Sequence, residues 1–130
     1  MIFYQKTGGE KMKNWEARWI TDAAFINLQP VDLFTKQSSP KTEHREDLKN
    51  HHMLVRKTFT ITDKPRKVLL DISADDYYKL YINGLYAAQG PAPGYPFHYY
   101  FNRLDVTGFL HPGMNTIAVH IYYQGLVNRV

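Results

Sequence analysis

The chain has 130 residues, which is one domain's worth and is enough for a real hydrophobic core. Hydrophobic residues make up 44% and charged residues 22%, as in an ordinary globular protein, and the absence of cysteine excludes a disulfide scaffold and a thiolate metal site. The net charge of +4 comes from basic residues that are scattered among acids without a Lys/Arg run, so nucleic-acid binding is only a minor alternative.

The first 50 residues show no regular pattern. The start, Met1–Lys6, has no basic segment followed by an apolar one, so no signal peptide is visible. No apolar run approaches the ~20 residues of a membrane span, and we expect a cytoplasmic protein. A polar run over Lys36–Asp47 has the composition of a long surface loop. We therefore expect residues 1–50 to form an irregular segment that packs on a core formed by residues 51–130.

From residue 53 onward, apolar and polar residues alternate with a period of two, which is the pattern of half-buried β-strands. The alternation predicts strands near residues 54–62, 67–75, 77–83, 85–89, 97–102 and 116–123. Asn83 and Gly84 separate two of these runs. Because both residues tolerate the positive φ of a type I′ turn, this pair predicts a β-hairpin.

The connections between these runs are rich in glycine and proline. Gly90–Pro96 contains three prolines, which remove backbone donors and fix φ, so the sequence predicts an ordered loop there. Leu104–Leu110 is typical of a strand end followed by one tight helical turn. Short strands with such turns predict an all-β fold, an antiparallel two-sheet jelly-roll sandwich like that of galactose-binding domains.

The end of the chain, Ile121–Val130, is apolar and aromatic and lacks the polar tail of many natural C-termini. We expect the parent chain to continue beyond Val130, so that this domain is a fragment of a larger protein.

Several of these segments together resemble the N-terminal domain of bacterial α-L-rhamnosidases, a family of glycoside hydrolases. They share that family's Trp-rich entry, its Phe-containing strand, its strand with an Asn-Gly turn, its Pro-Gly loop and its Asp-Val-Thr segment. In chain order they are Trp15–Ile20, Val55–Phe59, Ile72–Gly84, Gly90–Gly94 and Leu104–Asn115. The same order of motifs recurs in sugar-binding jelly rolls of other glycosidases. Tyr122–Leu126 departs from the Gly-x-Gly-Trp-Tyr segment that follows the last strand in many rhamnosidases.

The resemblance implies a non-catalytic carbohydrate-binding domain of an α-L-rhamnosidase-like glycoside hydrolase. In that family, acidic residues of a downstream helical barrel carry out inverting hydrolysis, which needs two carboxyl groups roughly 6.5–9.5 Å apart. Such a barrel does not fit in 130 residues, so we expect no catalytic residue and no cofactor here. The implied partners are a rhamnose-containing glycan and the catalytic domain of the parent chain. The alternative is a purely structural domain that docks against that barrel.

The adjacent acids Asp75 and Asp76 are poor catalysts, because successive strand residues point to opposite faces and do not flank one bond. They are expected to end a strand, bind a cation or hydrogen-bond sugar hydroxyls. Polar residues at the turns have a structural explanation, since their side chains satisfy backbone groups. These residues are Asn83, Asp105, Thr107 and Asn115. No third ligand accompanies His51 and His52 at a useful spacing, so no metal site is predicted.

The aromatic residues around the Pro loop are the strongest candidates for sugar binding. Flat rings stack on the apolar faces of sugars, while Tyr hydroxyls and nearby Asp, Asn or His side chains bond the sugar hydroxyls. The competing interpretation is core packing plus a surface docked on other domains. The candidate residues on this hairpin and loop edge are Tyr95, His98, Tyr99, Asn83, Asp75 and Asp76. Because the acidic pair lies ~20 Å from Asn83 along the strand, we favour the loop end.

Overall fold

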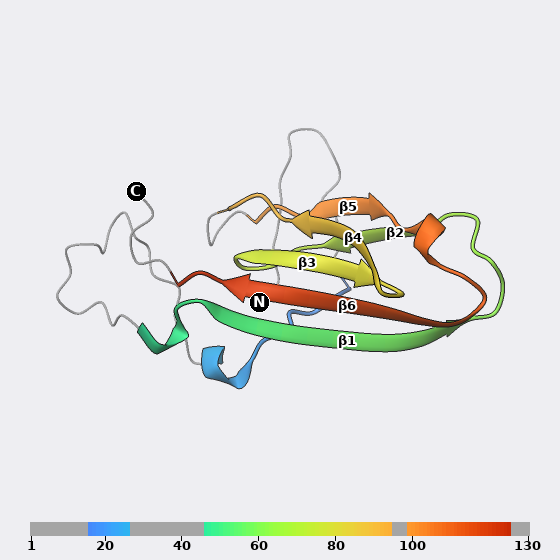
Figure 1. The fold of residues 1–130 in the computed structure, drawn as a ribbon. Helices are drawn as coiled ribbons and strands as arrows, with labels where there is room; N and C mark the ends of the chain where they lie inside the picture. The colour runs from blue at the N-terminus through green and yellow to red at the C-terminus, as the bar shows by residue number, and fades with distance from the viewer. Residues whose placement is uncertain (1–15, 27–45, 95–98, 126–130) are drawn as a thin grey trace, which may run out of the picture.

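The structure is a computed structural model that describes residues 16–26, 46–94 and 99–125. Its strands form two antiparallel sheets, as Figure 1 shows. The larger sheet has the order β1-β6-β3-β4, and the smaller one pairs β2 with β5. The strands are β1 (His51–Ile61), β2 (Leu69–Ile72), β3 (Tyr77–Ile82), β4 (Leu85–Gly90), β5 (Asn102–Asp105) and β6 (Gly113–Tyr123). The predicted all-β, two-sheet antiparallel sandwich is therefore confirmed.

Three single-turn 3₁₀ helices complete the described part of the chain. They are η1 (Ala23–Phe25), η2 (Glu46–Leu48) and η3 (Thr107–Phe109). The last of these is the tight helical turn that the sequence predicts after β5. No helix in the described residues is long and apolar enough to cross a membrane.

The core lies between the two sheets and is centred on β3. Tyr78, Leu80 and Ile82 are almost completely buried, and they alternate with less buried neighbours as a half-buried strand requires. Val106 and Leu110, which flank η3, close the core from the side of the smaller sheet. The period of two in the sequence therefore identifies the buried face of β3 correctly.

The Asn83-Gly84 turn has the predicted conformation. Asn83 and Gly84 have φ values of 51° and 81°, as a type I′ turn requires, and they join β3 to β4. The Asn83 side chain also reaches beyond its own turn. Its Nδ2 donates to the Phe109 carbonyl and to Asn115 Oδ1, each at 2.8 Å, and its Oδ1 accepts the Thr116 N–H at 2.8 Å. The turn residue thus connects the hairpin to η3 and to β6.

One predicted strand is wrong. The sequence predicts a strand at 97–102, whereas residues 99–101 are not in a strand and β5 covers Asn102–Asp105. Residues 97 and 98 lie outside the described part. The partner strand decides the position of β5, because Ile72 at the end of β2 pairs with Asn102. An aromatic run shows that a segment can be half-buried, but it does not show where that segment meets a partner.

The other strands differ from the prediction in their ends. β2 is shorter than the predicted 67–75 because its partner β5 has only four residues. By contrast, β1 and β6 pair along their whole lengths, from His51 with Tyr123 to Ile61 with Gly113, so both begin before their predicted starts at residues 54 and 116.

Candidate functional site

The β3–β4 hairpin decides which candidate residues meet. β4 returns antiparallel to β3, and Gly90 pairs with Tyr78 near the start of β3. The loop that begins at Pro91 therefore starts at the same end of the hairpin as Asp75 and Asp76. Asn83 lies at the opposite end. The expectation that the Pro loop lies with Asn83 and away from the acidic pair is wrong, because a return strand of equal length brings the chain back to where the first strand began.

Asp75 and Tyr99 lie together at this end. The Tyr99 hydroxyl donates to Asp75 Oδ2 at 2.8 Å. The Trp19 ring lies beside the Tyr99 ring, with 5.9 Å between centroids and an interplanar angle of 59°. Both rings are half-buried and Asp75 is exposed. We call these three residues the Trp19 cluster.

The segment that carries Tyr99 is held by the end of the smaller sheet. Ser73, directly after β2, donates its hydroxyl to the Tyr100 carbonyl at 2.7 Å. Tyr100, the next residue in the chain, has a side chain that is 43% exposed. Rings with a carboxylate and phenol hydroxyls between them suit a sugar, whose C–H faces stack and whose hydroxyls hydrogen-bond.

Asp76 has a structural role, because it makes hydrogen bonds to the backbone at the end of β6. Its side chain is buried and accepts the Gln124 N–H at 2.8 Å, and its own N–H donates to the Tyr122 carbonyl at 3.2 Å. Asp76 therefore joins the start of β3 to the end of β6. The neighbouring carboxylates have different surroundings, since Asp75 is exposed and Asp76 is buried, and both precede β3 instead of lying in a strand.

The structure separates the remaining candidates. Asn83 lies at the far end of the hairpin and is occupied by the contacts with Phe109, Asn115 and Thr116. Tyr95 and His98 lie outside the described residues. Of the six candidate residues, Asp75 and Tyr99 are thus in direct contact, and Asp76 follows Asp75 in the chain. Sequence reasoning missed Trp19, because it stands 80 residues before Tyr99 and no local pattern connects the two.

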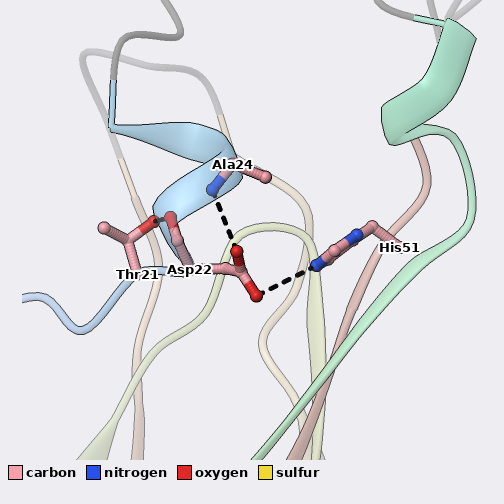
Figure 2. A network of polar contacts seen from close by, with 4 residues as sticks. All are labelled: Thr21, Asp22, Ala24 and His51. Carbon is pink, nitrogen blue, oxygen red and sulfur yellow. Dashed lines mark hydrogen bonds and ion pairs between the residues drawn. The ribbon is translucent and has the colours of Figure 1, made fainter.

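The residues around Trp19 are anchored to the larger sheet by a polar network (Figure 2). Asp22 caps η1 by accepting the Ala24 N–H at 2.9 Å, and its Oδ2 lies 3.6 Å from His51 Nε2 at the start of β1. The Ala24 N–H, and then the His51 ring, hold the pKa of Asp22 below its usual value. The Phe25 ring meets the rings of His51 and Tyr123 edge-on, each with 5.0 Å between centroids.

A pair of histidines also went unrecognised in the sequence. His52 Nδ1 lies 2.8 Å from His120 Nε2, and the His52 ring stacks on Tyr122 with 4.9 Å between centroids. The β1–β6 register creates this pair. His120 on β6 lies opposite Leu54 on β1, so His52, two residues before Leu54, is the diagonal neighbour of His120. Among the described residues, no group of three or more His, Cys, Asp or Glu side chains could hold a metal ion.

Neither a protein-family model nor a curated protein matches the chain. A solved structure that resembles it is a GH78-family rhamnosidase of Bacillus sp. GL1, with 31% sequence identity and a TM-score of 0.56 over 60% of this chain. The chain corresponds to 8% of that enzyme's length. The domain is related to a glycoside hydrolase. This relation confirms the sequence-based expectation of a glycoside-hydrolase-related domain.

A second solved structure is more distant. It is an FMN-binding β-glucuronidase from Faecalibacterium prausnitzii L2-6, with 18% identity and a TM-score of 0.45 over 56% of this chain and 11% of that one.

Proposed function

We propose that the chain is a non-catalytic carbohydrate-recognition domain of an α-L-rhamnosidase-like glycoside hydrolase, and that it binds sugar at the Trp19 cluster. The observation that carries the proposal is the 31% identity to part of a GH78-family rhamnosidase. The cluster supplies the chemistry. Trp19 and Tyr99 offer rings for the C–H face of a sugar, and the exposed Asp75 carboxylate accepts hydrogen bonds from hydroxyls.

In this proposal the domain recognises a rhamnose-containing glycan and presents it to the catalytic domain of the parent chain. Asp75 and Asp76 do not act as an acid–base pair, because one carboxylate bonds Tyr99 at the surface while the other is buried on the Gln124 N–H. Inverting hydrolysis needs two carboxyl groups on opposite sides of one bound sugar.

The second candidate function is a structural domain that docks against the catalytic domain. The large apolar side chains of Ile20 and Ile26 favour it, because each is 68% exposed and they lie on either side of η1. Exposed apolar side chains that lie near one another mark surfaces for protein contacts.

The test is a titration of rhamnose, and then of a rhamno-oligosaccharide, into the ¹⁵N-labelled chain. We expect amide and indole shifts at Trp19, Asp75 and Tyr99, and we expect Asp75→Asn with Tyr99→Phe to remove them. Tyr86→Phe is the matched control, because it also deletes one phenol hydroxyl but lies next to the turn end of β4. An absence of shifts at millimolar sugar would favour the docking function. Turnover of an aryl α-L-rhamnoside that Asp75→Asn or Asp76→Asn abolishes would contradict the non-catalytic role.

A further inference from the structure

The side of the larger sheet that points away from the core carries a second surface, which we call the outer face. Its residues alternate along each strand with core residues such as Leu80 and Val119. The face includes Leu54, Arg56, Lys79, Tyr81, Ala118, His120 and Tyr122. Leu54, Arg56 and Lys79 are exposed, and the other four are partly exposed.

The charges on this sheet have one sign. None of the sequences of β1, β3, β4 and β6 contains an Asp or a Glu. The outer face nevertheless carries the cations Arg56 and Lys79, together with the ring nitrogens of His52 and His120. The acids on described strands lie on the smaller sheet, at Asp71 and Asp105. An acid-free sheet face with permanent cations favours an anionic ligand.

The register brings these groups into one compact array. Lys79 pairs with His120, which in turn pairs with Leu54. One step further along the strands, Ala118 lies between Arg56 and Tyr81. With neighbouring strands about 4.8 Å apart, the cations on β1 and β3 stand on the order of 10 Å from each other across β6.

Aromatic pairs border this array at both ends. His52 stacks on Tyr122, with 4.9 Å between centroids and an angle of 27°. At the other end Tyr81 and Tyr86 meet edge-on at 5.8 Å. The contacts hold these rings in place, so that a ligand that stacks on them orders few side chains. The hydroxyls of Thr58 and Thr116, 3.4 Å apart, add polar groups on the same face.

We propose that the outer face binds a glycan that carries carboxylate groups, an oligouronide. Arg56 binds one carboxylate with its planar fork of donors, Lys79 binds another as a point charge, and the tyrosine rings stack on the sugar C–H faces. The site is separate from the Trp19 cluster, which lies beyond the ends of the strands, and it takes a charged glycan instead of a neutral one.

The composition of the outer face favours this ligand over two others. Stable interfaces between protein domains are depleted of charged residues at their centres, whereas here two cations and a histidine stand at the centre. Nucleic-acid sites need a larger group of Lys and Arg side chains than the two found here. A neutral sugar can accept hydrogen bonds from Arg56 and Lys79, but it lacks the negative charge that cations on an acid-free face attract.

The test is a calorimetric and NMR titration of the 130-residue chain with an oligogalacturonate and with the same oligosaccharide after reduction of its carboxyl groups. We expect binding of the first ligand only, with shifts on β1, β3 and β6. The double variant Arg56→Gln and Lys79→Gln is expected to bind at least about tenfold more weakly, which is about 1.4 kcal/mol, because it loses a charge-assisted hydrogen bond at each position. Circular dichroism checks that the variant is folded.

The matched control is Lys64→Gln with Arg66→Gln, which removes the same two charge types from exposed positions between β1 and β2. An equal loss in this control would show general charge attraction and overturn the proposal. Equal binding of the reduced ligand, no binding at millimolar ligand, or a dimer formed through the outer face would overturn it too. Asp75→Asn with Tyr99→Phe is expected to leave oligouronide binding unchanged, so the two sugar proposals fail independently.

Discussion

At the scale of single residues, Tyr78 places a hydrogen-bonded hydroxyl group in the hydrophobic core. Its ring is 1% exposed, and its hydroxyl donates to Asn102 Oδ1 at 2.9 Å. Burial, with a smaller contribution from Tyr86, raises the pKa of Tyr78 to about 12. The folded protein therefore holds this proton more tightly than the unfolded chain, in which a tyrosine has a pKa of about 10.

This shift predicts alkaline destabilisation. Because the folded pKa is the higher one, the contribution of Tyr78 to stability is complete below pH 10 and is lost as the pH rises from about 10 to about 12. Tyr78→Phe should lower the free energy of unfolding by about 1 kcal/mol at pH 8 and should make the decline above pH 10 shallower. Urea unfolding at pH 8, 10 and 11 measures both effects. An unchanged alkaline slope in the variant would assign the decline to other groups.

Glycine is required at position 90, at the end of β4, because a side chain does not fit there. A Cβ at this position would lie 2.2 Å from Asn102 Oδ1, which is already engaged by the Tyr78 hydroxyl. Gly90→Ala should therefore displace Asn102, break that hydrogen bond and cost about 1–3 kcal/mol of stability. Gly108→Ala is the control, because nothing lies within 4 Å of its Cβ. Thermal unfolding of the two variants compares them, and equal melting temperatures would contradict the steric argument.

At the scale of elements, two asparagines join connections that are distant in the sequence. Asn115 is completely buried, and besides Asn83 it contacts the His111 backbone: its Oδ1 accepts the His111 N–H at 3.2 Å and its Nδ2 donates to the His111 carbonyl at 2.7 Å. Nδ2 donates to the Gly113 carbonyl as well, at 3.0 Å. The pair thus locks the β3–β4 turn against the connection between η3 and β6.

Asn115→Asp tests this lock at nearly constant shape. A carboxylate lacks the two N–H donors that face the carbonyls of His111 and Gly113, so we expect the free energy of unfolding in urea to fall by about 2–4 kcal/mol.

Asn83→Gly keeps the positive φ of the turn but removes the side-chain hydrogen bonds, and it should lower the free energy of unfolding by about 1–3 kcal/mol. An unchanged free energy of unfolding in Asn83→Gly would mean that Asn83 contributes only to the turn.

The helix cap at Asp22 makes the stability of η1 depend on pH. The pKa of Asp22 is held low mainly by the Ala24 N–H, so the contribution of this cap is present at neutral pH and is lost as the pH falls through the lowered value, below about 4. We expect the protection of the Ala24 amide against exchange with solvent to fall as the pH is lowered through the pKa of Asp22, beyond the change in intrinsic rate. In Asp22→Asn that acid-dependent step should disappear. The same step in the variant would contradict the assignment to Asp22.

At the scale of the whole molecule, β6 holds the larger sheet together. It lies between β1 and β3 and pairs with both, so the first and last described strands are neighbours (Figure 1). A chain that ends at Leu110 should therefore lose the sheet signal in circular dichroism and cooperative unfolding, because β1 and β3 would lack their shared partner. Cooperative unfolding of the truncated chain would show that the strands re-pair without β6.

The sequence by itself determined the elements whose causes are local. The period of two identified the buried face of β3, and Asn83-Gly84 identified the hairpin, because a type I′ turn needs two adjacent residues that accept positive φ. The motifs at Ile72–Gly84 and Leu104–Asn115 also indicated the relation to a glycoside hydrolase, which the comparison with a solved rhamnosidase confirms.

Only the tertiary structure decided which distant residues meet. The pairing of His52 with His120 and the position of β5 depend on strand register, which no local pattern states. The contact of Trp19 with Tyr99 joins two segments outside the strands that lie far apart in the sequence. The return of β4 along β3 also placed the Pro loop beside Asp75 instead of Asn83. Alternation along one strand tells which side is buried. Which strands become neighbours is set by the packing of all of them around one core.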